Sequence, residues 1–177
     1  MHKKRKLVLF IASSLDGYIA TKDDALDWLY DVEGEGDNGY SEFYNTVDTI
    51  LMGKRTYDWI MNQELKEFPY KNKECYVFSR SLTKDTEDVK FVNRDVVHFV
   101  NQLKSENGKN IWIVGGGELL HSLMKEELVD ELIITVAPIL LGKGIPLFKE
   151  VDKQFNLSLK EVRKFNQFVE LHYEVKN

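Results

Sequence analysis

Cysteine is nearly absent from this sequence, which has a single one, Cys75, among 177 residues. One cysteine excludes an internal disulfide. Cys75 lies in a β-prone run that ends at Phe78, where we interpret it as a small buried side chain rather than a reactive thiol. A free thiol of this kind fits the reducing cytosol, where disulfides rarely persist.

Long apolar runs are absent as well. No stretch approaches the roughly 18–20 apolar residues that a transmembrane helix needs. The basic residues 1–6 precede a short apolar run at residues 7–12, whereas the apolar core of a signal peptide has about 7–15 residues. The sequence therefore predicts a cytoplasmic protein.

An excess of positive charge is also missing. Lysine and arginine total 24 against 29 aspartates and glutamates, which gives a formal net charge of −5. Because nucleic acids and membrane surfaces are polyanionic, this charge argues against both as partners.

Several common catalytic and nucleotide-binding motifs are missing too. The four histidines show no metal-ligand spacing, so we expect no metal site. The sequence has no G-x-S-x-G turn, no G-x-x-x-x-G-K-[ST] phosphate loop and no G-x-G-x-x-G segment after its first strand. The sequence therefore carries no motif of serine hydrolases, P-loop enzymes or Rossmann dehydrogenases.

Segments typical of strands and helices alternate along the chain. We expect helices at residues 40–47, 55–61, 95–106 and 118–125, and strands at residues 7–12, 18–20, 49–52, 75–78, 89–92, 111–114 and 132–141, the last broken by Pro138. Residues 155–162 and 168–175 flank a turn and predict a C-terminal antiparallel hairpin. The pattern predicts an α/β fold in one domain over residues 1–177, with a mixed, mostly parallel sheet and helices on both faces.

Two glycine turns each join an apolar strand to a helix. The first contains Gly53, and the second contains the three consecutive glycines Gly115, Gly116 and Gly117. Free backbone N–H groups and the helix dipole favour an anion at such a place, and glycine lets the backbone approach it closely. Two such turns on one sheet suit a ligand with a pyrophosphate, such as a dinucleotide.

Taken together and in order, six segments resemble the dihydrofolate-reductase-like family, in the branch of the riboflavin-biosynthesis reductase domain and its stand-alone relatives. They are Ser14-Leu15-Asp16-Gly17-Tyr18-Ile19-Ala20, Leu51-Met52-Gly53-Lys54-Arg55-Thr56, Val77-Phe78-Ser79-Arg80, Val114-Gly115-Gly116-Gly117-Glu118-Leu119, Asp130-Glu131-Leu132 and residues 138–148. The resemblance covers nearly the whole chain. It implies a dihydrofolate-reductase-like fold with an eight-stranded sheet, NADPH across the strand ends, and a homodimer.

The resemblance also implies a role for individual residues. Ser79 and Arg80 would contact the 2′-phosphate of the cofactor, which favours NADPH over NADH. A phosphate would be held by Gly53, Lys54, Arg55 and Thr56. The pyrophosphate and the nicotinamide side of the cofactor would be held by Gly115, Gly116, Gly117, Glu118 and Leu119. The nicotinamide would be bordered by Ala12, Asp16, Gly17 and Ile19.

The proton donor has two candidates. A gapless count back from Gly53 places Asp37 where dihydrofolate reductases carry a buried carboxylate. Thr135, in the expected strand at residues 132–137, falls where the family has a threonine that supports this carboxylate. Glu42, on the next helix, is the rival acid. Asp16 we interpret as a turn residue rather than an acid.

The sequence as a whole predicts an NADPH-dependent reductase that acts on a small heterocycle of the pterin, pyrimidine or riboflavin-precursor kind. Its rivals are a dihydrofolate reductase proper, an NADP-binding regulatory module without turnover, and a structural protein that binds no dinucleotide. The substrate and the closure of the loop at residues 31–39 stay open.

Overall fold

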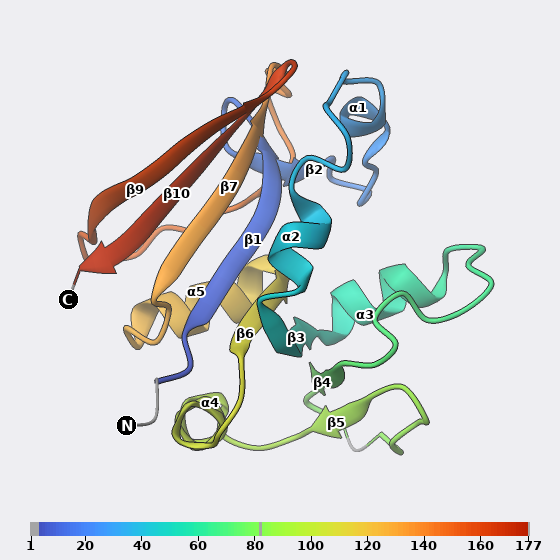
Figure 1. Ribbon diagram of the computed structural model, residues 1–177. Helices are drawn as coiled ribbons and strands as arrows, with labels where there is room; N and C mark the ends of the chain where they lie inside the picture. Colours follow the sequence, from blue (N-terminus) through green and yellow to red (C-terminus); the bar gives the residue numbers. More distant parts are fainter. Residues whose placement is uncertain (1–3, 82, 177) are drawn as a thin grey trace.

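Eight strands form one mixed sheet in the order β5-β4-β3-β6-β1-β7-β10-β9, within the residues that the computed structural model describes, 4–81 and 83–176 (Figure 1). All neighbours from β5 to β7 are parallel, while β7–β10 and β10–β9 are antiparallel. The strands are β1 Leu7–Ser14, β3 Val47–Gly53, β4 Glu74–Phe78, β5 Lys90–Val92, β6 Asn110–Gly115, β7 Glu131–Ala137, β9 Asn156–Phe165 and β10 Phe168–Lys176. The predicted α/β fold, with its mostly parallel sheet and C-terminal hairpin, is confirmed.

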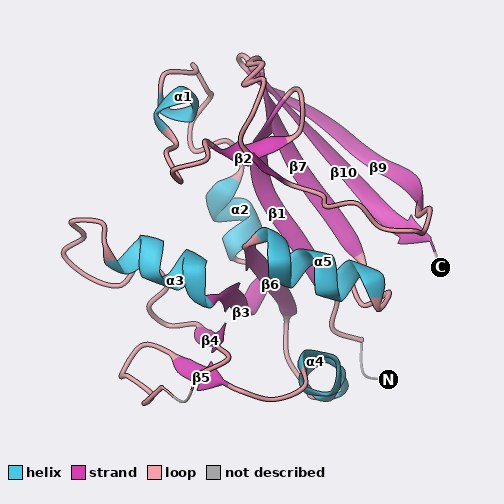
Figure 2. Cartoon of the chain, turned by 180° about the vertical axis from the view of Figure 1, so that it is seen from behind, coloured by secondary structure: helices cyan, strands magenta, loops and turns pink. Residues whose placement is uncertain are grey.

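Helices cover both faces of the sheet, as predicted (Figure 2). Helices α4, Val96–Ser105, and α5, Gly117–Lys125, pack on one face, and α2, Tyr40–Tyr44, and α3, Lys54–Met61, pack on the other. A short helix, α1, Asp27–Tyr30, and a two-stranded ribbon of β2, Tyr18–Ala20, and β8, Ile145–Pro146, complete the fold. None of the helices in the described residues has the length and apolarity that crossing a bilayer requires.

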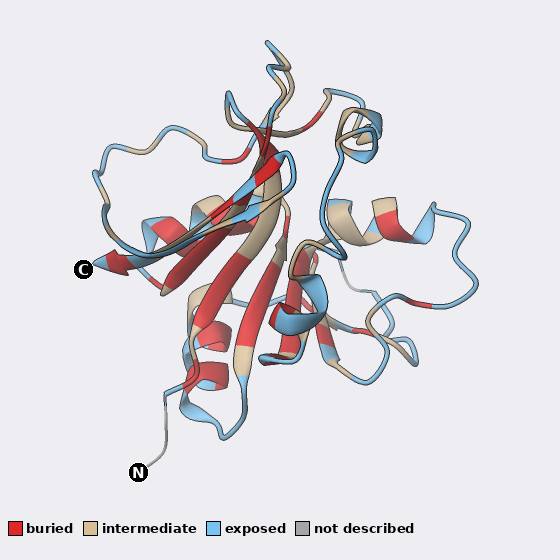
Figure 3. Cartoon of the chain, turned by 45° about the horizontal axis from the view of Figure 1, so that its top comes forward, coloured by how far each residue is buried: buried red, intermediate tan, exposed pale blue. Residues whose placement is uncertain are grey.

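Burial follows from the position of each strand in the sheet (Figure 3). The central strand β1 has Leu7, Val8 and Leu9 all at most 2% exposed, because helices cover both of its faces. The outermost strand β9 is largely exposed. An uninterrupted apolar run therefore marks a central strand, whereas an alternating one marks the hairpin.

Two predicted elements end earlier than expected, and two short elements were not predicted. The helix expected at residues 40–47 ends at Tyr44, because Val47 already pairs with β6. The strand expected over residues 132–141 ends at Ala137, directly before Pro138, which has no N–H for the ladder. Helix α1 and strand β8 are too short to leave a periodic pattern, and were not predicted.

A buried carboxylate ties the start of β7 to three other segments. Both oxygens of Glu131 are used: Oε1 accepts from Lys6 Nζ at 2.9 Å and from Lys160 Nζ at 2.6 Å, and His172 Nε2 lies 3.1 Å from Oε2. Glu131 is 5% exposed. Burial opposes its ionisation, but the hydrogen bonds from the lysines and the histidine prevail and lower its pKa to about 2.

We expect Glu131→Gln to lower the free energy of unfolding at pH 7 by about 2 kcal/mol, a value below the full pKa shift because the two lysines are partly exposed. A lowered pKa stabilises the fold above the unfolded value and loses this effect as the pH falls. The difference between variant and native protein should therefore shrink from about pH 4.5 to about pH 2. Urea unfolding across this range measures it, with the exposed Glu126→Gln as the control. A difference that does not change with pH would contradict the assignment.

Candidate functional site

The carboxyl ends of the parallel strands lie along one edge of the sheet. Strands β1, β3, β4, β6 and β7 end there at Ser14, Gly53, Phe78, Gly115 and Ala137. The antiparallel strand β10 begins at the same edge, because Val169 pairs with Val136 near the end of β7. Ligands of open α/β sheets bind outside this edge. Most of the predicted site residues lie on it.

The two glycine turns lie side by side at this edge. Strands β3 and β6 are neighbours, and Met52 pairs with Gly115. A Cβ placed on Gly53 would lie 3.7 Å from the backbone nitrogen of Gly116, and a Cβ on Gly116 would lie 3.3 Å from Thr56 Oγ1. The backbones of the two turns therefore approach each other closely, and the hydroxyl of Thr56 reaches the second turn.

Both turns lead into helix N-termini that no side chain caps. Gly53 is the N-cap residue of α3 and Gly116 that of α5, and neither helix has a side-chain hydrogen bond at its cap. The first N–H groups of a helix have no partner within the helix, and the dipole makes this end positive. Two such ends next to each other form a place that suits a doubly charged anion.

Charged side chains surround the start of α5. Lys149 pairs with Glu118, and its hydrogen bond and charge lower the pKa of that carboxyl, with a smaller contribution from Arg80. Arg80 is exposed just beyond the end of β4. The buried Ser79 before it has its Oγ 3.1 Å from Ser81 Oγ. Arg80 thus extends from the carboxyl end of β4, at the same sheet edge as the second glycine turn.

The two basic residues at the start of α3 are held by surface ion pairs. Lys54 Nζ lies 2.6 Å from Asp58, and Arg55 Nη2 lies 3.0 Å from both carboxylate oxygens of Asp24. Exposed pairs of this kind contribute little to stability. Both side chains can therefore exchange their carboxylate partners for a phosphate at small cost.

The loop between β1 and β2 is fastened to the segment after β7. Asp16 accepts hydrogen bonds from Ser14 Oγ at 2.6 Å, from Leu141 N at 3.1 Å and from Gly142 N at 2.8 Å. These bonds, that from Ser14 first, lower the pKa of Asp16 despite partial desolvation. Gly17, with φ of 89°, donates its N–H to Ser14 O at 3.1 Å and closes the turn. Asp16 thus acts as a turn residue in this structure.

Four side chains form a row across β1, β7, β10 and β9 at the same edge. Ala12 pairs with Thr135, Thr135 with Glu170, and Glu170 with Arg163. Directly opposed residues project to the same face of a sheet, with Cβ atoms about 4.5–5.5 Å apart. The face is the one that α2 covers, since Phe10 in β1 stacks on Phe43 in α2 with ring centroids 4.2 Å apart. Thr135 and Ala12, both predicted site residues, are brought together here.

Sequence reasoning missed two residues of this row, Arg163 and Glu170, of which Glu170 is the buried one. It is 2% exposed, its Oε1 accepts from Arg163 Nε at 2.9 Å, and its Oε2 has no hydrogen-bond partner among the described residues. A signal for it exists in the sequence. A turn at Asn166 and Gln167 sets Arg163 opposite Glu170, a cross-strand charge pair at inward positions of the hairpin.

The two predicted acids lie on the surface around α2. Asp37 accepts from Gly39 N at 3.2 Å and from Ser41 N at 2.9 Å, and the hydrogen bonds with Ser41 lower its pKa. Glu42 is 72% exposed and pairs with Arg163 Nη1 at 2.8 Å. Asp37 therefore orders the entry to α2, and Glu42 is joined through Arg163 to Glu170.

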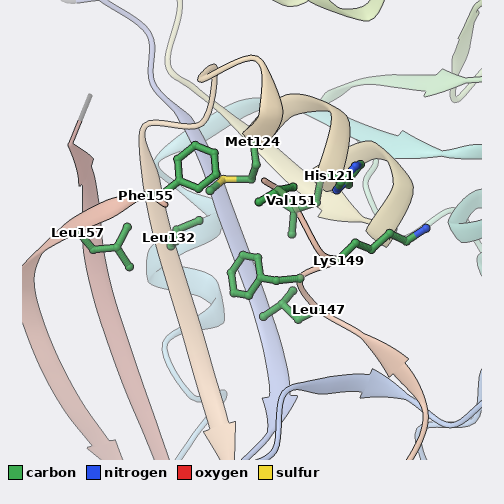
Figure 4. Close-up of a pocket in the computed structure, with 10 residues that line it drawn as sticks. His121, Met124, Leu132, Leu147, Lys149, Val151, Phe155 and Leu157 are labelled. Atoms are coloured by element: carbon green, nitrogen blue, oxygen red, sulfur yellow. The ribbon is translucent and has the colours of Figure 1, made fainter. Parts of the chain in front are cut away.

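A separate apolar cavity of about 220 Å³ lies on the opposite face of the sheet from Thr135, between α5, β7 and the chain that follows β8 (Figure 4). Met124, Leu132 and Phe155 are among the apolar side chains that line it, and Lys149 extends away from them. An apolar lining of this kind does not suit a phosphate-bearing ligand. The sheet edge therefore suits such a ligand better than this cavity does.

The chain is similar to known proteins both in sequence and in structure. Residues 5–171 match the sequence model of the RibD C-terminal domain. The protein YwjB of Bacillus subtilis (strain 168) is 51% identical, over 96% of this chain and 98% of its own. A crystal structure from Shewanella sp. PV-4, of a provisionally named riboflavin biosynthesis protein, superposes with a TM-score of 0.87 at 32% identity, over 97% of this chain and 99% of that one.

A more distant structure has the same fold. Dihydrofolate reductase from Enterococcus faecalis, complexed with NADP(H) and RAB-propyl, superposes over 100% of both chains with a TM-score of 0.68 at 17% identity. The predicted dihydrofolate-reductase-like fold and the predicted family are both confirmed by these relatives.

We expect Asp16→Ala to loosen the contact between the β1–β2 loop and the segment after β7. The amides of Leu141 and Gly142 lose their acceptor and should exchange with deuterium several-fold faster, because both bonds run to the same carboxylate. Hydrogen exchange followed by NMR measures this, with the exposed Asp23→Ala as the control. Unchanged exchange at both amides would show that Asp16 does not hold this segment.

Proposed function

The chain belongs to the family of the RibD C-terminal domain, and we propose that it is an NADPH-dependent reductase that transfers a hydride to a small heterocyclic substrate. The family and the structural relatives support a reductase-type fold. The observation that carries the proposal is the pair of uncapped helix N-termini at Gly53 and Gly116, whose backbones lie side by side. This arrangement fits the pyrophosphate of a dinucleotide.

The residues at the sheet edge fit the parts of NADPH. The N–H groups that follow Gly53 and Gly116, with the hydroxyl of Thr56, would hold the pyrophosphate. Arg80 would bind the 2′-phosphate through its guanidinium. Ala12 and Ile19 would border the nicotinamide, which when bound supplies the hydride. The remaining cofactor contacts are proposed for Asp16, Gly17, Lys54, Arg55, Ser79, Gly115, Gly117, Glu118 and Leu119.

The substrate would lie beside the nicotinamide, over Ala12 and Thr135. Reduction of a C=N bond needs a proton at nitrogen, delivered by a side chain or by water. The proposal keeps Asp37, Glu42 and Thr135 as the groups to test. The surface positions of the two acids favour a role in supplying protons from solvent rather than as a buried donor. The resemblance to the family further favours a cytoplasmic homodimer that acts on a pterin-, pyrimidine- or riboflavin-precursor-like ring.

A second function is favoured by one observation. Neither Asp37 nor Glu42 is a buried acid, which is what an NADP-binding regulatory module without turnover would show. The two functions differ in a single assay. A reductase oxidises NADPH when a reducible heterocycle is added, whereas a regulatory module binds NADPH and leaves it reduced.

We expect the protein to bind NADPH more tightly than NADH, and Arg80→Ala to remove most of that preference. The affinity for NADPH should fall about 10- to 100-fold, because a charge-assisted hydrogen bond to phosphate contributes about 1.5–3 kcal/mol. The affinity for NADH should change little, since NADH lacks the phosphate. Titration followed by nicotinamide fluorescence measures both affinities.

The matched control is Lys84→Ala, which removes an exposed positive charge four residues further along the chain. It should leave both affinities unchanged. Equal weakening of NADPH and NADH by Arg80→Ala would contradict the assignment of the 2′-phosphate. Binding of neither cofactor by the native protein would overturn the proposed function.

A further inference from the structure

We propose that Glu170 recognises the substrate, and that it selects a heterocycle that presents N–H donors on one ring edge, as an aminopyrimidine does. This inference rests on the proposed function, because it places the ring beside the nicotinamide. It goes beyond that function in naming the anchoring side chain and the chemistry that the substrate must offer. Three observations carry it: the free oxygen of Glu170, its place in the row at the sheet edge, and the side chain that covers it.

The first observation is the unused oxygen. Glu170 is 2% exposed, and Arg163 Nε occupies Oε1 at 2.9 Å. Oε2 is fully buried and has no hydrogen-bond partner among residues 4–81 and 83–176. The ion pair of Arg163 with Oε1 leaves Oε2 as a hydrogen-bond acceptor without a donor. A buried charged acceptor without a donor is costly, and a ligand that supplies an N–H removes that cost.

The second observation is position. Glu170 lies directly opposite Thr135, which lies directly opposite Ala12. Ala12 borders the nicotinamide in the proposed complex. A ring that lies over Ala12 and Thr135 therefore has its far edge at β10, next to Glu170. The hydride and the carboxylate would then act on opposite parts of one small ring.

The third observation is the cover over Glu170. The guanidinium of Arg163 lies against Gly39, where a Cβ would come within 2.8 Å of Nη2, and its Nη1 pairs with Glu42. Glu42 is 72% exposed, so this outer ion pair is weak. Binding there requires that this outer pair opens and that the guanidinium of Arg163 moves aside, so that a ligand reaches Oε2.

The chemistry of a carboxylate sets the preference. An ionised carboxylate accepts hydrogen bonds and donates none. It therefore favours ring N–H and exocyclic amino groups and disfavours a ring edge made only of carbonyl or ether oxygens. A site built around a buried hydrogen-bonding group discriminates strongly against analogues that lack the partner.

The test uses the full chain and two probes, 2,4-diaminopyrimidine and its donor-free analogue 2,4-dimethoxypyrimidine, titrated calorimetrically with and without NADPH. The native protein should bind the diamino compound at least about 10-fold more tightly than the dimethoxy compound. Glu170→Gln presents N–H donors in place of the acceptor, so it should weaken the binding of the diamino compound about 10- to 100-fold. NADPH affinity should stay within about two-fold of native, because Glu170 does not lie in the cofactor cradle.

The control is Glu174→Gln, an exposed carboxylate on the same strand and face, four residues along. This variant should bind both probes with the native affinity. If Glu170→Gln does not fold, Glu170→Asp keeps the charge but withdraws the oxygen by one methylene, and should also weaken the diamino compound.

The outcomes separate the two proposals. Equal binding of both probes by the native protein, binding of neither, or an unchanged affinity in the Glu170 variant would overturn the role of Glu170. Loss of NADPH binding by the native protein would instead overturn the proposed function, while the dependence of the probe on Glu170 would still decide this inference.

Discussion

The parallel pairing of β3 with β6 is the contact on which the candidate site depends. It sets Met52 opposite Gly115, so that each strand delivers its chain to the same edge at the same level. The two turns that follow lie close together, because a Cβ placed on Gly53 would lie 3.7 Å from the backbone nitrogen of Gly116. Larger residues at these turns would push them apart or fill the space between the helix ends. Glycine here serves a close approach of two backbones, with φ of 148° at Gly115 as a further requirement.

The other half of the site depends on a second set of pairings, across β1, β7, β10 and β9. These strands meet only because the hairpin folds back antiparallel on β7, although it is the last segment of the chain. The reversal puts the beginning of β10, with Glu170, at the carboxyl edge of the parallel strands. A seventh parallel strand in that place would have put its own carboxyl end there instead. The mixed topology is therefore what places a buried carboxylate next to Thr135.

The sequence predicted the features that depend on neighbouring residues along the chain. It did not predict the features that depend on which strands pair in the sheet. Gly53 and Gly115 could be assigned to strand–helix turns because an apolar run and a helical pattern flank each of them. Asp37 was placed by a gapless count, which ignores how the loop at residues 31–39 folds, and the structure puts it at the entry to α2. The pair of Arg163 and Glu170 was within reach, because the turn of the hairpin sets its register. Its burial was not, because that requires knowing that β10 lies against β7.

The buried charges of the fold show why Glu170 calls for a functional explanation. Arg5 is 4% exposed, and its Nε, Nη1 and Nη2 each have an acceptor within 3.1 Å. Glu131 uses both oxygens. Both therefore satisfy the rule that a buried charge is fully paired.

Two buried side-chain atoms in the described residues break this rule, His121 Nδ1 and Glu170 Oε2. An imidazole nitrogen loses less by this than an oxygen of a carboxylate that forms an ion pair. Because Arg5 and Glu131 are fully paired, the unpaired oxygen of Glu170 at the sheet edge fits a partner outside the chain. Departures from complete pairing concentrate at functional sites, and the position of Glu170 beside Thr135 makes the substrate the partner that fits.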